Sequence, residues 1–541
     1  MKTILTVLIL FLCNFNAKTQ VSLEWDVTHN GSANLNDEGK SIVYDGQGNV
    51  VVTGNVISTG INYDIATVKY NSAGVRQWTA VFNGPGNDAD YAVDIATDNA
   101  ANIYVAGKSR SNGDYDMLLI KYNSAGVQQW AVTWNSPSGL TDEGYSVTVD
   151  NNQNAYITGY AEISGFNTNY VTVKYNSSGV LQWARQYDGP IANSPDLAYF
   201  IESDPSGNVY VTGTSTAPGT GSDFLTIKYN PQGDSVWVRR FAGPGNSSNE
   251  IPQGMDVDQS GNVYVTGFYS GPQSIDYMTI KYNTSGTQQW AMAYDSTHGQ
   301  DIPEDITVDP SGNVFVTGRS RINSSYNDFC TIKYNSSGVR QWLRVYNNPT
   351  ESLDDIGLDV EADAQGNVYV TGITNEDGSN YSIITIKYDA GGVQKWLAEY
   401  DGNDDDECYQ MALDQSNNIY VVGFTDNANT DFLTLKYSQT VGINQFTTEI
   451  PDRFRLHQNY PNPFNPVTKI RFDVPSSSQL SNVRLTVFDA AGRKVEELVN
   501  QILSAGSYEA DFNAGNRTSG IYFYELAAGD FSETKKMVVL K

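Results

Sequence analysis

The stretch DPSGNVYVTG, from Asp204 to Gly213, returns almost unchanged as DPSGNVFVTG from Asp309 to Gly318. Looser copies begin at Asp258 and Asp363. Asp, Asn and Gly also occur in calcium-binding loops, but an EF-type loop needs more carboxylates than one copy supplies. Asp at the first position, Pro at the second and Gly at the fourth are typical of a type I turn whose last residue has positive φ. The phrase therefore predicts a tight turn between two strands.

A tryptophan and a Lys-Tyr pair recur around each copy at one common spacing. The tryptophans are Trp25, Trp78, Trp130, Trp183, Trp237, Trp290, Trp342 and Trp396, and the lysines are Lys69, Lys121, Lys174, Lys228, Lys281, Lys333, Lys387 and Lys436. Both series give eight units of about 53 residues. Each unit contains four short segments rich in Val, Ile, Thr, Tyr and Trp, which predicts four β-strands per unit and an all-β chain.

Four-stranded antiparallel units repeated radially form the blades of a β-propeller, whereas a β-solenoid uses shorter repeats. The segment around Trp25 stands before the first complete unit, and the last unit ends at Tyr437 without a tryptophan segment. We therefore expect an eight-bladed β-propeller over residues 21–437, in which the N-terminal strand completes the last blade. Such closure removes the exposed strand edges of an open ring.

The repeat also resembles a known family. The pattern D-x-x-G-N-V-Y-V-T-G, followed by D-F-x-T-I-K-Y-N-x-x-G and Q-W, resembles the SBBP-type β-propeller repeat of exported bacterial proteins. The resemblance extends from about Val21 to Tyr437. The family name implies seven blades, so the expectation of eight rests on the count in this sequence.

The first residues predict export. Lys2 is followed by an apolar run from Ile4 to Leu12 and then by small and polar residues around Ala17. This run is too short to span a bilayer but fits the core of a signal peptide. We expect residues 1–20 to be a signal peptide that is cleaved near Ala17, with no transmembrane segment after it.

The periodicity stops after Tyr437. We expect residues 438–453 to be a linker and residues 454–541 to form a small Ig-like β-sandwich. The motifs YPNPFNP, VFDAAGRKV, SGIYFYEL and KKMVVLK resemble the type A C-terminal sorting domain of type IX (Por) secretion cargo. The resemblance implies the type IX machinery as a partner and passage through the periplasm to the cell surface or the medium. An ordinary Ig-like adhesion module is the alternative.

The net charge of −28 argues against a nucleic-acid partner, because a strongly negative surface repels phosphates. One carboxylate stands eight residues before each turn Asp. These candidate site residues are Asp37, Asp90, Asp142, Asp196, Glu250, Asp301, Asp355 and Asp406. They could bind a ligand or a cation, calcium being the cofactor considered, at the opening of the propeller. Alternatively, each carboxylate accepts backbone N–H bonds where its strand begins.

No catalytic motif such as G-x-S-x-G or H-E-x-x-H occurs, and the three histidines do not recur with the repeat. No catalytic residue is therefore assigned. We expect a secreted or surface-displayed binding module for a protein or glycan ligand, rather than an enzyme. The alternative function is an exported carbohydrate-active enzyme that uses acidic residues at the propeller channel.

Overall fold

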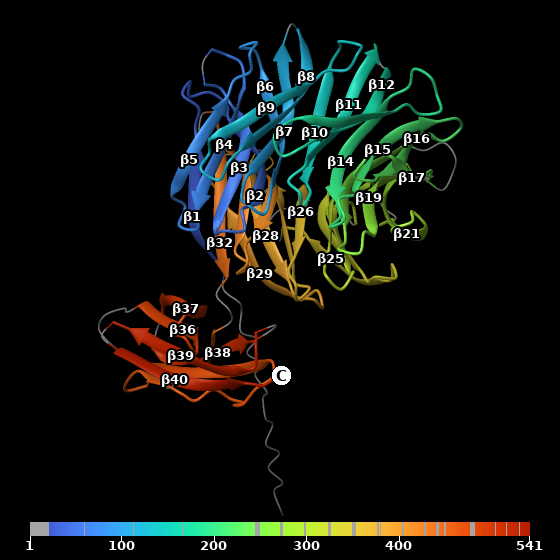
Figure 1. Cartoon of the computed structure of the whole chain (residues 1–541). Coiled ribbons are helices and arrows are strands. Elements are labelled where there is room, and N and C mark those ends of the chain that lie inside the picture. The colour runs from blue at the N-terminus through green and yellow to red at the C-terminus, as the bar shows by residue number, and fades with distance from the viewer. Residues whose placement is uncertain are drawn as a thin grey trace, which may run out of the picture. The chain divides into compact units, whose positions relative to one another are not determined.

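The computed structural model describes residues 21–540 except 59, 112, 166, 244–248, 271–273, 297–298, 323–325, 349–352, 376–377, 379, 403–404, 427–428, 440–442, 448–450, 476–481, 504, 515–516 and 530 (Figure 1). The expected signal peptide and its cleavage near Ala17 lie outside these residues. The described elements are all β-strands, as predicted. They divide into two compact units, Ser22–Ser438 and the chain from Gln439 onwards.

Seven four-stranded antiparallel sheets of the first unit consist of consecutive strands. The first two sheets contain β2 (Glu38–Tyr44), β3 (Asn49–Val56), β4 (Asp64–Asn71) and β5 (Arg76–Phe82), and β6 (Asp90–Thr97), β7 (Ile103–Ser111), β8 (Asp114–Tyr122) and β9 (Gln128–Trp134). The third, fourth and fifth contain β10 (Asp142–Val149), β11 (Ala155–Ser164), β12 (Asn167–Tyr175) and β13 (Leu181–Tyr187); β14 (Asp196–Ser203), β15 (Val209–Ala217), β16 (Gly221–Tyr229) and β17 (Ser235–Phe241); and β18 (Glu250–Val257), β19 (Val263–Ser270), β20 (Ile275–Tyr282) and β21 (Gln288–Tyr294). The sixth and seventh contain β22 (Asp301–Val308), β23 (Val314–Ser320), β24 (Asp328–Tyr334) and β25 (Arg340–Tyr346), and β26 (Asp355–Ala362), β27 (Val368–Asn375), β28 (Tyr381–Tyr388) and β29 (Gln394–Tyr400).

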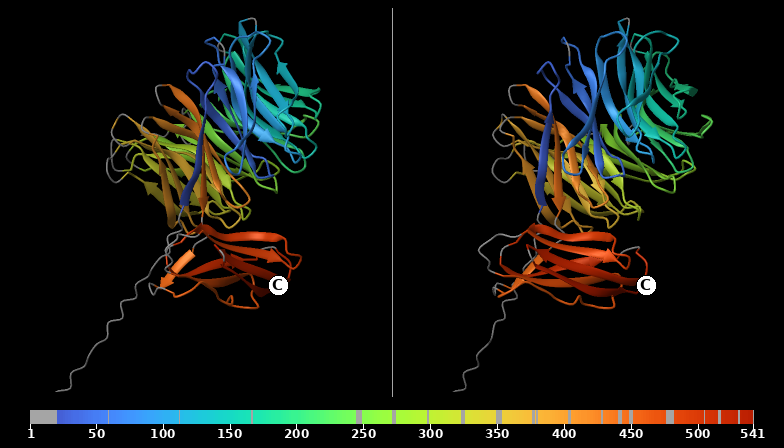
Figure 2. Two further views of the ribbon diagram at one scale, coloured as in Figure 1. Left: turned by 90° about the vertical axis from the view of Figure 1, so that its left-hand side faces the viewer. Right: turned by 60° about the vertical axis from the view of Figure 1, so that its left-hand side comes forward.

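The eighth sheet joins the two ends of this unit. It contains β30 (Asp406–Leu413), β31 (Ile419–Asp426) and β32 (Thr430–Gln439), and its fourth strand is the N-terminal β1 (Val21–His29), in the order β1-β32-β31-β30. The views in Figures 1 and 2 show the blue strand β1 beside the orange strands of this sheet. The segment around Trp25 therefore occupies the place of the missing tryptophan strand.

The phrase DPSGNVYVTG forms the turn between β14 and β15. Asp204 Oδ1 accepts bonds from the backbone N–H groups of Ser206 (2.9 Å) and Asn208 (3.0 Å), while Oδ2 accepts from Asn208 Nδ2 (2.7 Å) and the Tyr210 hydroxyl (3.0 Å). Gly207 has φ +78°, a conformation that glycine adopts without strain. The carboxylate therefore holds the turn together, which accounts for the recurrence of Asp, Asn and Gly.

The recurring Lys and Trp clamp neighbouring sheets together. Lys174 Nζ and Trp183 Nε1 both donate to the carbonyl oxygen of Pro231 in the next sheet, at 2.9 and 3.2 Å. A Cβ on Gly233, which has φ +83°, would lie 2.8 Å from the Trp183 ring, so this turn residue must be glycine for the indole to pack. The repeated anchors are thus packing residues between sheets.

The first strand of each sheet lies innermost. These strands contact one another in chain order, β2 with β6, β6 with β10, β10 with β14, β14 with β18, β18 with β22, β22 with β26 and β26 with β30, and β30 also contacts β2. Apolar side chains fill the space between successive sheets in separate clusters, one of which joins residues of the first and eighth sheets. The sheets therefore surround a common centre.

The second unit contains two further four-stranded sheets, β33-β38-β35-β34 and β37-β36-β39-β40. Its strands are β33 (Ile443–Thr447), β34 (Arg455–Leu456), β35 (Val467–Val474), β36 (Asn482–Asp489), β37 (Lys494–Ile502), β38 (Gly506–Asn513), β39 (Gly520–Ala528) and β40 (Phe531–Val539). One apolar cluster, which includes Phe472 and Tyr524, contains residues of both sheets. The segment expected to be a linker contains β33, which pairs with β38, so part of it belongs to this unit.

Among the residues that the structure describes, none forms a helix with the length and apolar character needed to cross a bilayer.

Candidate functional site

The eight predicted site residues lie where the innermost strands begin, and all are fully buried. Each accepts a hydrogen bond from a backbone N–H in the loop that precedes its strand, at 2.5–3.0 Å in seven of the eight sheets. The donors are Gly31, Gly84, Ser136, Gly189, Gly243, Ser296, Asn348 and Gly402. None of the eight carboxylates lines the central cavity described below. Their geometry is that of loop anchors.

Burial raises the pKa of several of these carboxyls. For Asp142 and Asp355 it raises the pKa to about 6, although the N–H groups of Ser136 and Asn348 oppose the shift. Exclusion of water from the site penalises the ionised carboxylate, whereas a hydrogen-bond donor stabilises it.

One predicted residue, Asp301, lies in a group that could hold a metal ion. Ligand atoms of Asp276, Asp295 and Asp301 lie within 4.8 Å of one another. Oxygen ligands of this kind suit calcium. Asp276 opens the third strand segment of its sheet and Asp295 follows the fourth strand, whereas Asp301 begins the next sheet.

The repeat shows why this group is unusual. In each sheet two positions are equivalent to Asp276 and Asp295, namely the start of the third strand and the residue after the fourth strand. In the other seven sheets only one of these two positions is acidic. The pairs are Asp64 with Asn83, Asp116 with Asn135, Asn169 with Asp188, Asp223 with Ala242, Asp328 with Asn347, Ser382 with Asp401 and Asp431 with Asn30. Asn135 and Asn347 donate to their partner carboxylates at 2.6 and 2.5 Å. The sheet with Asp276 and Asp295 has two carboxylates where the others have one.

Replacing Asp295 by Asn, the residue at four of the equivalent positions, is expected to raise the melting temperature slightly, by about 1–2 °C without added cation. The change removes a like-charge repulsion and supplies an amide donor. Millimolar calcium should raise the melting temperature of the unmodified chain only modestly, because Asp276 and Asp301 already accept bonds from Ser274 and Ser320. Differential scanning calorimetry with and without calcium measures both effects. A calcium shift above about 10 °C that Asp295→Asn abolishes would instead demonstrate a specific ion site.

A second set of residues was missed by the sequence reasoning. Each innermost strand has a β-bulge two to four residues after its buried carboxylate. A bulge inserts one residue and redirects its side chain. The repeated glycine that ends the phrase provides the space: a Cβ on Gly213 would lie 1.9 Å from the carbonyl oxygen of Leu197.

All eight bulge residues line a central cavity of about 590 Å³. They are Lys40, Val93, Tyr145, Tyr199, Gln253, Glu304, Leu358 and Tyr409. The positions that follow the bulge add Asp94, Glu202, Asp256, Asp305, Asp359 and Glu361 to the lining. Seven carboxylates and one ammonium group thus face this cavity.

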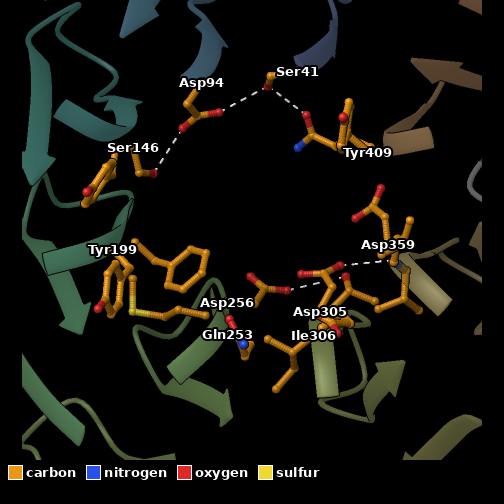
Figure 3. A pocket seen from close by; sticks show the side chains of 18 of the residues that line it. Ser41, Asp94, Ser146, Tyr199, Gln253, Asp256, Asp305, Ile306, Asp359 and Tyr409 are labelled. Atoms are coloured by element: carbon orange, nitrogen blue, oxygen red, sulfur yellow. Dashed lines mark hydrogen bonds between the residues drawn. The ribbon is translucent and has the colours of Figure 1, made fainter. Parts of the chain in front are cut away.

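Four of these carboxylates connect sheets that share no backbone ladder. Asp94 Oδ2 accepts from the Val147 N–H at 2.8 Å, and Asp256 Oδ2 accepts from the Val308 N–H at 2.7 Å. Asp305 and Asp359 accept in the same way from Val360 (3.0 Å) and Met411 (2.5 Å). Figure 3 shows Asp94 between Ser41 and Ser146 on one side of the cavity, and Asp256, Asp305 and Asp359 on the other. These four side chains hold neighbouring innermost strands together.

Glu202 and Glu361 form no ion pair among the described residues. Burial, with repulsion from Asp256 and other cavity carboxylates, raises the pKa of each to about 8. The Glu202 side chain is exposed to the open space of the cavity, and the protein around that space disfavours its ionised form. Burial also raises the pKa of Asp305 and Asp359, which share a hydrogen bond. These two glutamates are therefore cavity carboxyl groups that hold a proton near neutral pH and have no ion-pair partner among the described residues.

Alignment of the eight repeats contains the signal that identifies this set. The position three residues after the buried carboxylate is Lys, Val, Tyr, Tyr, Gln, Glu, Leu and Tyr in turn, whereas the turn Asp and the Lys-Tyr pair do not vary. The bulge that turns this position into the cavity is marked in the sequence by the repeated glycine opposite it, such as Gly213.

Comparison with known proteins agrees with both resemblances. Residues 458–540 match the secretion system C-terminal sorting domain, and residues 137–167, 236–267 and 296–324 match the β-propeller repeat. The chain therefore contains β-propeller repeats. It carries a type IX sorting domain, which indicates export to the cell surface or the extracellular space and contact with the type IX machinery.

Weaker similarities to other proteins are also found. A WD repeat-containing protein of Acanthamoeba polyphaga mimivirus is 22% identical over a match that covers 72% of this chain and 33% of the viral protein. This chain thus spans about a third of that relative. Among solved structures, an ulvan lyase has a TM-score of 0.40 with 10% identity over 76% of this chain and 95% of its own. A protein of unknown function from Dyadobacter fermentans has a TM-score of 0.38 with 9% identity over 77% of this chain and 99% of its own.

Proposed function

We propose that the eight sheets are the blades of a closed eight-bladed propeller, with β1 as the outer strand of the last blade. The cyclic contacts of the innermost strands and the order β1-β32-β31-β30 support this arrangement. In this proposal, residues 1–20 are a removed signal peptide, the propeller extends from residue 21 to the end of β32, and an Ig-like sorting domain follows. The sorting domain includes β33, so the connection between the two is shorter than the sequence suggests.

We further propose that the exported propeller binds a protein or glycan ligand at its central cavity. This proposal rests on the contrast between framework residues that recur in every repeat and cavity residues that differ from repeat to repeat. Asp, Asn, Lys and Trp recur to build the sheets and their clamps, while the eight bulge residues differ in charge, size and aromatic character. Variable side chains on a rigid frame are a common basis for selective binding.

The chemistry of the lining also suits a ligand. Tyr145 and Tyr199 stack with ring centroids 6.0 Å apart and an interplanar angle of 30°. Aromatic faces and carboxylates together can hold a sugar ring or a polar side chain, and the cavity volume is that of a small-molecule site.

A glycan array probed with the full exported chain tests this proposal. We expect binding to a restricted set of glycans, and we expect replacement of Tyr145, Tyr199 and Tyr409 by Ala to weaken it by about tenfold or more, since each loses an aromatic contact. Tyr460→Ala, which changes a tyrosine that is 79% exposed in the sorting domain, is the matched control. Equal binding by the triple variant would contradict a role for the cavity.

An exported carbohydrate-active enzyme is the second candidate. The raised pKa of Glu202 and Glu361, about 8 in each case, is a property that general acids share. Incubation of the full chain with every glycan that it binds, followed by analysis of the products, separates the two functions. Turnover that is lost in Glu202→Gln or Glu361→Gln would favour the enzyme.

A further inference from the structure

Two lysines, Lys40 in the lining of the cavity and Lys108 outside that lining, show how this protein holds a primary ammonium group. Lys40 Nζ lies 4.3 Å from the centroid of the Tyr409 ring and 2.5 Å from Glu38 Oε2. Lys108 Nζ lies 5.0 Å from the centroid of Tyr115 and 2.9 Å from Glu143 Oε1. In both places an aromatic face and a carboxylate surround one ammonium group, which is the arrangement expected for cation–π binding with charge compensation.

The opposite part of the cavity has the same components without a cation of its own. Tyr145 and Tyr199 form a stacked pair, and Glu202 follows Tyr199 on β14. Within the described part of the chain, no lysine or arginine lies over either ring, and none pairs with Glu202 or Glu361. Both glutamates line the same cavity as the two tyrosines.

Acidic side chains outnumber basic ones in the lining of the cavity. Seven carboxylates and only Lys40 of opposite sign line it. Backbone N–H donors compensate Asp94, Asp256, Asp305 and Asp359. Arg319 Nη2 lies 3.3 Å from Glu304 Oε1. A cationic ligand would stabilise the ionised forms of Glu202 and Glu361, to which the backbone N–H groups of Ser203 and Ala362 donate, whereas a neutral ligand would leave both side chains protonated.

A single metal ion fits this cavity less well than an organic cation. Among the described residues, the group whose ligand atoms approach within 4.8 Å of one another is Asp276, Asp295 and Asp301, and none of these lines the cavity. The two glutamates without an ion-pair partner among the described residues lie on strands of different sheets, β14 and β26, so a ligand with more than one ammonium group matches them better.

We propose that the ligand of the central cavity carries primary ammonium groups, which bind against the Tyr145–Tyr199 pair and the carboxylates of Glu202 and Glu361. The inference rests on the proposed binding function and names the chemistry of its ligand. Amino sugars and aliphatic polyamines both present this group, and sugar rings would also stack on the tyrosines.

Isothermal titration calorimetry of the full chain with three probes tests the inference. The probes are a glucosamine oligomer, the N-acetylated oligomer of the same length, and an aliphatic diamine. We expect the glucosamine oligomer to bind at least about tenfold more tightly than its acetylated form, because acetylation removes the charge. Binding of the diamine as well identifies the ammonium group as sufficient, whereas binding of only the glucosamine oligomer identifies an amino sugar.

Isosteric variants locate the effect. The double variant Glu202→Gln with Glu361→Gln should bind the aminated probe about tenfold or more weakly, since both charge-assisted contacts are lost. The double variant Asp188→Asn with Asp234→Asn removes two exposed charges outside the cavity and should leave the affinity unchanged. Tyr199→Phe should retain binding and Tyr199→Ala should lose part of it.

The pH dependence gives a second readout. Because an ammonium group favours the ionised carboxylate, affinity for the diamine should rise between about pH 6 and pH 8.5, with proton release on binding. The glutamates have a folded-state pKa above the usual value, so their contribution to stability is lost as the pH rises through about 8, and the melting temperature must be followed at each pH.

Two results would overturn the inference. The first is equal affinity for the acetylated and free oligomers, with no change in the Glu202→Gln and Glu361→Gln double variant. This result would show that the cavity binds neutral glycans, and it would reject the ammonium requirement but not the binding function. Failure of all three probes to bind, together with tight binding of another ligand that Tyr199→Ala abolishes, would also reject the ammonium group while preserving the binding function.

Discussion

A chain that lacks residues 21–30 is expected to unfold at a much lower temperature or to aggregate, although this segment lies about 400 residues from its partner strands. Deletion removes β1 from the eighth sheet and leaves the edge of β32 unpaired. It also removes Trp25, whose ring lies between Tyr70 (6.2 Å) and Tyr420 (5.9 Å). Loss of this half-buried Trp alone costs about 2 kcal/mol, which is a substantial part of the stability of a typical protein.

The expected loss of stability depends on the side chains of β1 that pack against the first and eighth sheets. Trp25 Nε1 donates to the carbonyl of Ser72 in the first sheet, and Trp25 and Val27 pack on the cluster that joins the first and eighth sheets. Leu23 is 43% exposed, so Leu23→Ser should change the melting temperature little, whereas Trp25→Ala should lower it strongly.

Thermal unfolding followed by circular dichroism compares these variants with the full chain. A synthetic peptide of residues 21–30 should restore part of the lost stability by occupying the vacant edge. An N-terminal deletion that melts like the full chain would show that the eighth sheet is stable with three strands, and would contradict closure by β1.

A chain that ends at Gln439 is expected to fold but to remain in the periplasm, with surface and extracellular protein reduced to background. The deletion removes the whole sorting unit, including β33, and leaves the first compact unit complete. Residues 458–540 match the sorting domain of type IX cargo, so the machinery loses the signal that it recognises.

Cell fractionation with antibody detection measures this effect, and the melting temperature of the periplasmic protein verifies its folding. A chain that ends at residue 453 is the informative control, because it retains β33 without its partner β38. It should be retained in the periplasm too, and the unpaired strand should promote aggregation. Normal amounts of either variant at the cell surface would refute the type IX assignment.

The sequence determined the framework because local chemistry specifies it. Asp204, Asn208 and Gly207 satisfy the requirements of one turn within five residues, and the same requirements recur in every copy. The tryptophans and lysines recur because each must reach one turn carbonyl of the next sheet, as Trp183 and Lys174 reach Pro231. The sorting motifs identify the C-terminal part in the same local manner.

Only the tertiary structure decided which acidic residues face the cavity. The sequence singled out Asp142 and its seven equivalents, which the structure places at buried loop anchors. The cavity residue Tyr145 lies three positions later, and the β-bulge between Gly144 and Ser146 changes the side on which the following side chains lie. Strict alternation along a strand predicts the wrong face beyond such a bulge. The hydrogen bond from the Val147 N–H to Asp94, and the lack of an ion pair at Glu202 among the described residues, follow from contacts between sheets that no single repeat encodes.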